Sequence, residues 1–294
     1  MRNVEVALKT RANLGECPRW DEQSQLLYWV DINACELHRF NPLTCEDDCL
    51  TFGEEIGCFV LRRDGGFVLA MRSGFYFMEN WGDELKAICD PEADIETNRF
   101  NDGRCDAAGR FIAGTVYPPK DKDGANFWTL DTDLSARLLV PGMLTSNGAA
   151  FSPDNRTFYF ANTPKHVIFR CDYNLENGTI GKAEVFHQFE YGNGRPDGAS
   201  VDSEGCYWTA LYEGGRIARL SPQGDILEEI PVPAKCPTMV AFGDQDLKTL
   251  YITSVGNRPD EELIAYPHSG SVFKVRVDVP GLPEHRFGAQ AILN

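Results

Sequence analysis

The sequence predicts an all-β fold, a six-bladed β-propeller formed by a single domain over residues 1–294, and three observations carry this prediction. First, a phrase made of an acidic turn and an apolar, aromatic strand recurs six times, with its aspartates at Asp21, Asp64, Asp106, Asp154, Asp202 and Asp246. Second, these aspartates are 43, 42, 48, 48 and 44 residues apart, which is typical of propeller blades. Third, β-branched and aromatic runs alternate with turn residues, without the longer 3.6-residue periodicity of helices.

Each repeat is expected to supply several antiparallel strands. The first strand of a unit, such as 26–31 or 157–161, is followed after a polar tip by another, such as 36–40 or 167–170. Radial closure of such units protects the edges of their sheets, which favours a ring over an open array. The N-terminal stretch 4–8 is expected to complete the last blade and close the ring.

Composition limits the partners. The chain has 294 residues, 43% of them hydrophobic, which is enough for a large buried core. Its 28 basic and 44 acidic residues give a net charge of −16, so nucleic acid is not an expected partner. No apolar run approaches the roughly 20 residues that span a bilayer, and the N-terminus lacks the apolar stretch of a signal peptide. We therefore expect a cytoplasmic protein with no membrane partner, and the sequence does not indicate its oligomeric state.

The ten cysteines are scattered through the chain. They show neither the spacing of a disulfide framework nor matching partners for a zinc ribbon. Most of them are expected to be reduced packing residues.

Four short polar segments occur in phase with the repeats, each at the start of an expected innermost strand. They are 15–18, 99–103, 146–148 and 196–198, and they carry Glu16, Asn101, Asn147 and Asp197. In a propeller the innermost strands surround the central channel, so these side chains are expected to converge. Two carboxylates and two carboxamides are hard oxygen donors for one divalent cation: calcium, magnesium or manganese, with zinc or iron also accepted. Taken singly, Asn-Gly and Pro-Asp-Gly are ordinary turn sequences, and only their phase with the repeats favours a common site.

These segments, in this order, resemble the signature segments of the regucalcin (senescence marker protein)/gluconolactonase family. The matching stretches cover Leu14–Trp20, Arg99–Gly103, Thr145–Gly148, Pro196–Gly198 and Leu250–Ser254, and the similarity extends over nearly the whole chain. The resemblance implies a six-bladed propeller with one divalent metal ion in the channel and, as in many members, hydrolysis of sugar-acid lactones. It assigns the metal ion to Glu16, Asn147 and Asp197. It assigns substrate contacts to Arg99, Asn101 and, in a loop expected to enclose the substrate, Tyr117.

Two residues beside these segments have more than one interpretation. The family's first motif usually reads Gly-Glu-Gly-Pro or Gly-Glu-Ser-Pro, whereas this chain has Cys17 at the third position. Its thiol would either bias the site toward a softer ion or serve as a small packing residue. Arg99 would either contact substrate or form a structural ion pair with Glu96 or Asp102.

Lactone hydrolysis makes chemical sense of these residue types. A divalent ion polarises a carbonyl group and lowers the pKa of a bound water, and a carboxylate accepts the proton of an attacking water. Asp197 is the expected catalytic base, but a carboxylate bound to a cation is a weak base, so it is expected first as a ligand.

The expected function is metal-dependent hydrolysis of an aldonolactone to the free acid, with L-arabinono- or galactono-lactone as first candidates. The alternatives are a calcium-binding regulatory protein without turnover and a hydrolase of other esters. Arg99 and Asn101 favour the enzyme, because calcium binding alone needs neither, and both suit a polyhydroxylated ligand.

Overall fold

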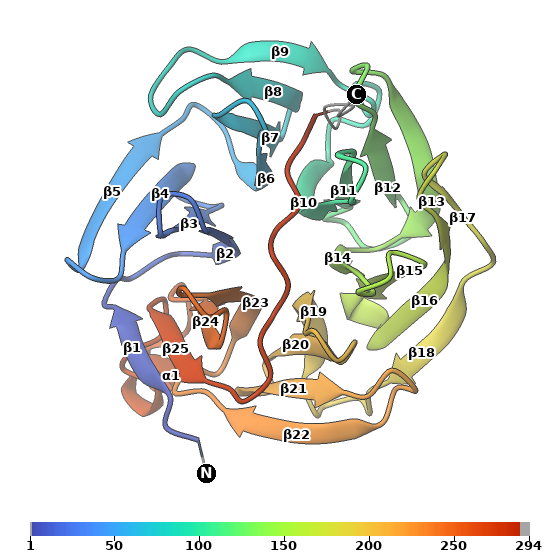
Figure 1. Cartoon of the computed structure of the whole chain (residues 1–294). Coiled ribbons are helices and arrows are strands. Elements are labelled where there is room, and N and C mark those ends of the chain that lie inside the picture. The colour runs from blue at the N-terminus through green and yellow to red at the C-terminus, as the bar shows by residue number, and fades with distance from the viewer. Residues whose placement is uncertain (1, 289–294) are drawn as a thin grey trace.

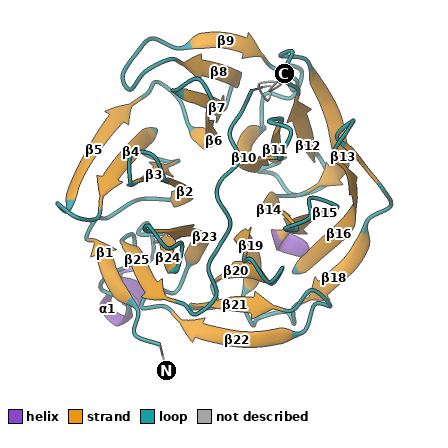
Figure 2. Ribbon diagram, in the orientation of Figure 1, coloured by secondary structure: helices purple, strands orange, loops and turns teal. Residues whose placement is uncertain are grey.

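Six antiparallel sheets are arranged as blades around a central axis (Figure 1). The structure, a computed structural model, describes residues 2–288, so Met1 and residues 289–294 of the expected domain lie outside the described residues. Strands dominate this part of the chain, which also contains a short helix, α1 (Asp260–Ala265), and a 3-10 turn, η1 (Thr163–Lys165) (Figure 2). Neither helical segment within residues 2–288 has the length and apolarity that a membrane crossing requires. The predicted all-β, six-bladed β-propeller is confirmed.

The first three blades follow one another along the chain, each from its innermost to its outermost strand. The first blade contains β2 (Gly15–Asp21), β3 (Leu26–Asp31), β4 (Glu36–Asn41) and β5 (Glu46–Thr51). The second contains β6 (Ile56–Leu61), β7 (Phe67–Met71), β8 (Gly74–Met78) and β9 (Lys86–Cys89). The third contains β10 (Arg99–Cys105), β11 (Phe111–Val116), β12 (Ala125–Leu130) and β13 (Ala136–Met143).

The last three blades complete and close the ring. The fourth contains β14 (Ser146–Phe151), β15 (Thr157–Asn162) and β16 (Val167–Asn174), with β17 (Thr179–Ile180) and β18 (Glu184–Gln188) both paired to β16. The fifth contains β19 (Arg195–Val201), β20 (Tyr207–Tyr212), β21 (Arg216–Leu220) and β22 (Ile226–Pro231). The sixth contains β23 (Pro237–Gly243), β24 (Thr249–Ser254), β25 (Val272–Arg276) and β1 (Glu5–Leu8). Because β1 pairs with β25, the N-terminal stretch closes the ring as predicted.

Burial decreases from the axis to the rim. Every residue of β2, β6, β14 and β23 is buried, whereas β5 at the rim is mostly exposed. Aromatic rings pack between neighbouring blades, as where Phe75 of β8 lies 4.4 Å from Phe100 of β10 between ring centroids. Each buried aliphatic or aromatic side chain contributes about 1.5–3 kcal/mol, so apolar packing between blades holds the inner strands rigidly around the axis.

The repeated aspartates lie in or beside the turns between the first and second strands of the blades. Asp21 accepts a hydrogen bond from the backbone N–H of Gln23 at 2.9 Å, and Asp106 accepts one from Arg110 at 2.8 Å. Such contacts are typical of Asx turns, in which the side chain takes the place of a backbone acceptor. The regular spacing of the aspartates therefore reports the spacing of these turns. The turns follow the ends of the inner strands, whereas the polar segments lie at the beginnings of those strands.

The C-terminal segment 278–288 crosses the ring at this same end of the inner strands, and it is the red trace over the centre of Figure 1. Gly281 bridges to Asp202 in the fifth blade, and Phe287 bridges to Arg62 at the end of the second blade's inner strand. One end of the channel is therefore covered by the chain itself.

This C-terminal segment also brings charge into the channel. Glu284 accepts a hydrogen bond from Arg104 Nη1 at 2.9 Å and lies 3.8 Å from Arg19 Nη1. Arg286 forms an ion pair with Asp21. The opposite end of the channel, where the inner strands begin, holds the polar segments.

Candidate functional site

A polar pocket with a cavity volume of about 190 Å³ lies where the inner strands begin. Its wall includes Glu16 of β2, Asn101 of β10, Asn147 of β14 and Asp197 of β19. Four blades thus each supply at least one polar side chain. The structure therefore brings together the four residues that occupy equivalent places in the repeats and were predicted to share one site.

A shift in strand register accompanies each of these side chains. The pairing of inner and second strands shifts just after Glu16, Phe100, Asn147 and Pro196. Such bulges redirect side chains and are frequent beside active sites. Gly148 lies in one of them with φ +63°, and a Cβ there would lie 2.2 Å from the Tyr207 hydroxyl oxygen. Asn147-Gly148 and Pro196-Asp197-Gly198 are therefore bulged strand segments rather than hairpin turns.

Glu16 and Asp197 are buried carboxylates, 7% and 4% exposed, and neither forms an ion pair with any residue in 2–288. Burial, followed by the charges of Asp197 and Asp102, raises the pKa of Glu16 well above its usual range. Burial, followed by the charge of Asp102, raises the pKa of Asp197 in the same way. Two buried acids that repel one another are unfavourable without a cation, so this pair fits a divalent metal ion.

A chain of hydrogen bonds orients the amide groups. Arg99 Nη1 donates to Asn101 Oδ1 at 2.9 Å, and Asn101 Nδ2 donates to Asn147 Oδ1 at 2.8 Å. Asn147 Nδ2 donates to Thr163 Oγ1 at 2.8 Å, and Thr163 donates to the carbonyl of Pro196 at 2.7 Å. An amide oxygen has two lone pairs, so Asn147 Oδ1 retains one for a cation.

Arg99 does not form a structural ion pair, which was one of the two interpretations that the sequence allowed. Within the described residues it pairs with neither Glu96 nor Asp102, and it donates from Nη1 to the carbonyl of Phe100 at 2.8 Å and to Asn101. Its Nε and Nη2 have no hydrogen-bond partner in residues 2–288. Two donors of Arg99 therefore remain available at the pocket wall.

The structure does not place Tyr117 on the pocket wall, as the sequence analysis expected. Its ring is buried at the base of the loop 117–124, packed against Gly124, and Lys122 Nζ lies 5.4 Å from its centroid. An aromatic ring gains more from burial in the blade than from contact with a polar pocket. The loop residue that reaches the pocket is Lys120, whose only sequence signal was the unusual charge and proline content of the loop.

Arg195 is a second pocket residue that the sequence analysis missed. It lies two positions before Asp197 in β19, and alternate residues of a strand share a face, so this spacing could have indicated it. Its Nη2 donates to Glu213 at 2.8 Å, and its guanidinium lies 4.8 Å from the ring centroid of Tyr212. Part of its donor capacity is therefore already used.

The thiol of Cys17 faces the protein backbone rather than the pocket. The side chain is buried, its Sγ accepts from the backbone N–H of Phe59 at 3.4 Å, and it lies 3.6 Å from the Phe59 carbonyl oxygen. Burial raises the pKa of this thiol to about 11. Of the two interpretations of Cys17, the structure supports the packing residue.

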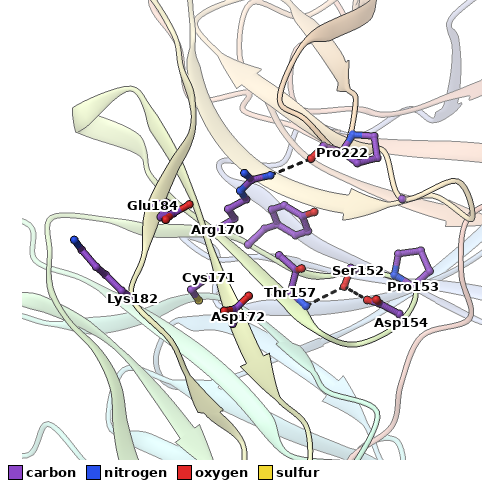
Figure 3. A pocket seen from close by; sticks show the side chains of 12 residues that line it. Ser152, Pro153, Asp154, Thr157, Arg170, Cys171, Asp172, Lys182, Glu184 and Pro222 are labelled. Carbon is purple, nitrogen blue, oxygen red and sulfur yellow. Dashed lines mark hydrogen bonds between the residues drawn. The ribbon is translucent and has the colours of Figure 1, made fainter.

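A larger cavity of about 480 Å³ lies away from the axis, where the fourth and fifth blades meet (Figure 3). Some of its polar groups already have hydrogen-bond partners. Arg170 donates to the carbonyl of Pro222 at 3.2 Å, and Ser152 Oγ donates to Asp154 at 2.6 Å and accepts from the Thr157 N–H at 3.0 Å. None of the predicted site residues lines it. The smaller pocket on the axis, with its unpaired carboxylates, is the candidate site.

Comparison with known proteins identifies the family. A sequence profile described as the SMP-30/Gluconolactonase/LRE-like region matches residues 14–256. The chain belongs to this family. The family that the motifs predicted is therefore confirmed, and the profile spans all four polar segments.

Members of the SMP-30/gluconolactonase family with assigned names match nearly the whole chain. A 6-deoxy-6-sulfogluconolactonase of Pseudomonas putida is 47% identical over 276 residues, covering 93% of this chain and 94% of that protein. A pentonolactonase of Haloferax volcanii is 35% identical over 290 residues, covering 96% and 97%. The structure of a calcium-binding protein, regucalcin, from Agrobacterium tumefaciens superposes with a TM-score of 0.93 at 26% identity, covering 97% of each chain.

Proposed function

We propose that this member of the SMP-30/gluconolactonase family hydrolyses a sugar-acid lactone, using one divalent metal ion held by Glu16, Asn147 and Asp197. The observation that carries the proposal is a pair of buried, unpaired carboxylates beside oriented amide oxygens in a polar pocket on the axis. Relatives named as lactonases for a sulfogluconolactone and for pentonolactones cover most of the chain, which supports the same reaction class. The protein is accordingly a hydrolase that opens a cyclic ester.

The donor set suits a hard divalent cation. Glu16 and Asp197 supply two negative charges and Asn147 a neutral amide oxygen, which favours calcium, magnesium or manganese and also accepts zinc or iron. A bound ion of this kind would polarise the lactone carbonyl and lower the pKa of a water molecule. The repulsion between the two carboxylates, which raises the pKa of Glu16, would then be balanced.

Asp197 is our candidate for the general base. A water molecule attacks the carbonyl carbon of the lactone while a carboxylate oxygen of Asp197 takes one of its protons. The bond between the carbonyl carbon and the ring oxygen then breaks, and the proton passes from Asp197 to the ring oxygen, which becomes a hydroxyl group. One water is added in total, and the product is the open aldonic acid.

Arg99 and Asn101 bind and orient the sugar. The free Nε and Nη2 of Arg99 donate to sugar hydroxyls or to the ring oxygen, a fork that a lysine would not reproduce. Asn101 uses Nδ2 to donate to Asn147 and to the carbonyl of Ser146 at 3.1 Å. Its Oδ1 already accepts from Arg99, so only one lone pair of that oxygen remains for a sugar hydroxyl. Asn101 is therefore chiefly a positioning residue at the edge of the metal site.

A calcium-binding regulatory protein is the second candidate, and the structural similarity to a calcium-binding regucalcin favours it. The same three oxygen ligands would serve that role. The free donors of Arg99 favour the enzyme, because calcium binding uses no guanidinium group. The charged and amide side chains on the pocket wall favour sugar lactones over apolar esters.

The test is to remove metal with a chelator, restore single divalent ions, and follow acid release from a panel that includes D-glucono-, L-arabinono- and galactono-lactone. We expect turnover to be lost and then restored, and Asp197→Ala and Glu16→Ala to lower kcat/KM at least about a hundredfold. Turnover that persists without metal, or that survives both substitutions, would overturn the proposal. Metal binding without turnover of any lactone would support the regulatory protein instead.

A further inference from the structure

Three cationic side chains line the axial pocket together. They are Arg99 from β10, Lys120 from the loop 117–124 and Arg195 from β19, and we call them the cationic mouth. The chain as a whole carries a net charge of −16, so this concentration of positive charge does not follow from composition. A site for a divalent cation needs negative groups and does not explain it either.

The cationic mouth has unused hydrogen-bond donors. Lys120 forms no ion pair with any residue in 2–288, and burial, followed by the charges of Arg195 and Arg99, lowers its pKa. Arg195 Nε is buried without a hydrogen-bond partner, although Nη2 of the same side chain donates to Glu213. Together with Nε and Nη2 of Arg99, these groups form a set of donors that no described side chain satisfies.

The nearby acids do not neutralise the cationic mouth once a metal ion is bound. Glu16 and Asp197 are the acids of the pocket wall, and under the proposed function their two charges balance the divalent ion. Glu213 already pairs with Arg195 at 2.8 Å. Glu55 also acts on Arg99, but it is already paired with Arg72 at 2.6 Å. Lys120 and Arg99 therefore keep a net positive potential in the pocket.

We propose that the cationic mouth binds a negatively charged substituent of the substrate, so that the preferred lactone carries an anionic group at the end remote from its carbonyl. This inference rests on the proposed lactonase function. The lactone carbonyl would face Glu16 and Asp197, Arg99 would keep its contact with the sugar, and the anionic group would face Lys120 and Arg195. A sulfonate, a phosphate and a second carboxylate share this chemistry, because each offers several charged oxygen acceptors to lysine and arginine.

The size of the pocket agrees with such a ligand. Its volume of about 190 Å³ is below the roughly 300–1,000 Å³ of drug-sized ligand pockets, so it accommodates one sugar unit. Asp197 and Lys120 both line this pocket, and the charge of Asp197 acts on Lys120. A single sugar lactone can therefore lie with one end at the carboxylates and the other at the cationic mouth.

The kinetic test compares D-glucono-1,5-lactone with three charged analogues: the 6-phosphate, the 6-deoxy-6-sulfonate and a glucaric acid lactone. We expect the preferred charged lactone to exceed the neutral one in kcat/KM by about tenfold or more, with the ratio falling as salt rises. Lys120→Gln should lower the ratio of charged to neutral kcat/KM about tenfold. Lys122→Gln, in the same loop but on the ring of Tyr117, should keep the wild-type ratio.

A ratio that is unchanged in Lys120→Gln, or a preference for the neutral lactone in the wild type, would overturn the inference. The charged analogue with the highest kcat/KM identifies whether sulfonate, phosphate or carboxylate is the natural group.

A binding measurement separates this inference from the proposed function. Calorimetric titration of the metal-loaded protein with 6-phosphogluconate, 6-deoxy-6-sulfogluconate and gluconate requires no turnover. Tighter binding of a charged acid, reduced in Lys120→Gln and kept in Lys122→Gln, would support the cationic mouth even if no lactone were hydrolysed. Equal binding of all three acids by the wild type would overturn it even if lactonase activity were present.

Discussion

Asn101 Nδ2 donates to Asn147 Oδ1 at 2.8 Å, so two amide side chains join the third and fourth blades at the axis. The same Asn101 accepts a hydrogen bond from Arg99 through its Oδ1 at 2.9 Å. Because Asn147 Nδ2 is committed to Thr163, its oxygen is the atom that faces Asn101 and the pocket. One residue thereby orients a proposed metal ligand and a proposed substrate contact.

Substitution of Asn101 by alanine should weaken metal binding about tenfold, because residues that orient a metal ligand commonly contribute 10- to 100-fold in affinity. The measurement is competition with a chromophoric chelator. Asn98→Ala is the matched control, since Asn98 is also buried and donates to Glu92 at 2.7 Å and to the Gly124 carbonyl at 2.9 Å, outside the pocket wall. Asn98→Ala should lower stability only, and equal metal affinity in the two variants would contradict the role given to Asn101.

The stability of the metal-free protein should decrease as pH rises. The pKa of Glu16 and of Asp197 is raised, first by burial, above the unfolded values of about 4.3 and 3.9. The stabilisation that such groups add is fully present below the unfolded pKa and is lost as pH rises through the folded pKa. We expect Tm of the metal-free protein, measured from about pH 5 to about pH 8, to fall as pH rises above the unfolded values, and a divalent ion to raise it most at the upper end of this range.

Differential scanning calorimetry across this pH range, with and without metal, checks this expectation. Glu16→Gln removes one of the two titrating groups and should flatten the dependence of Tm on pH. A metal-free Tm that rises throughout the range would mean that other groups dominate.

The sequence predicted the part of the site that follows from the repeat. Glu16, Asn147 and Asp197 occupy the same place in three repeats, and closure of a ring brings equivalent places to one axis. Lys120 could not be predicted in this way, because the loop 117–124 belongs to one blade only. Its own conformation, with φ +54° at Lys120, decides which of its charged residues faces the pocket. The prediction that Tyr117 borders the pocket was based only on the composition of this loop. The position of Tyr117 is instead determined by burial of its ring.

The path of the C-terminal segment was also beyond sequence reasoning. Glu284 meets Arg104, 180 residues away in the chain, only because both lie on the axis of the closed ring. No local pattern distinguishes Glu284 from other acids of an acidic protein. The repeats predict the blades. The path of a segment outside the repeats depends on the shape and charge of the surface that the closed ring forms.

Cys17→Ser should leave the order in which divalent ions restore activity unchanged, because the thiol contacts the backbone of Phe59 and does not line the pocket. Cys17→Gly should change the free energy of unfolding by no more than about 1 kcal/mol. Its φ of +47° favours glycine, while loss of the buried side chain opposes that gain. Metal reconstitution and urea denaturation measure the two effects, and a changed order of ions in Cys17→Ser would reinstate the thiol as a determinant of the metal.

Glu284→Ala should destabilise the ring by about 3 kcal/mol, because it leaves Arg104 without its ion-pair partner and Arg19 with Asp102 alone, 4.0 Å away. Arg104 is 9% exposed and Arg19 is 2% exposed, and both lie within 4.0 Å of the Glu284 carboxylate. Urea denaturation at pH 7 measures the loss. The control is Asp278→Ala, which removes an exposed carboxylate of the same segment from its ion pair with Arg2 at 2.7 Å and should cost much less.

The pH dependence of this difference gives an independent check on Glu284. Burial opposes ionisation of this carboxyl, but the charges of Arg104 and Arg19 outweigh it and lower its pKa. The stability that such an acid adds is present above its unfolded pKa of about 4.3 and is lost as pH falls through the folded pKa. The gap between wild type and Glu284→Ala should therefore narrow as pH falls from 7 to about 3. A gap that stays constant over this range would show that the variant acts through lost packing, and that the two arginines do not depend on the charge of Glu284.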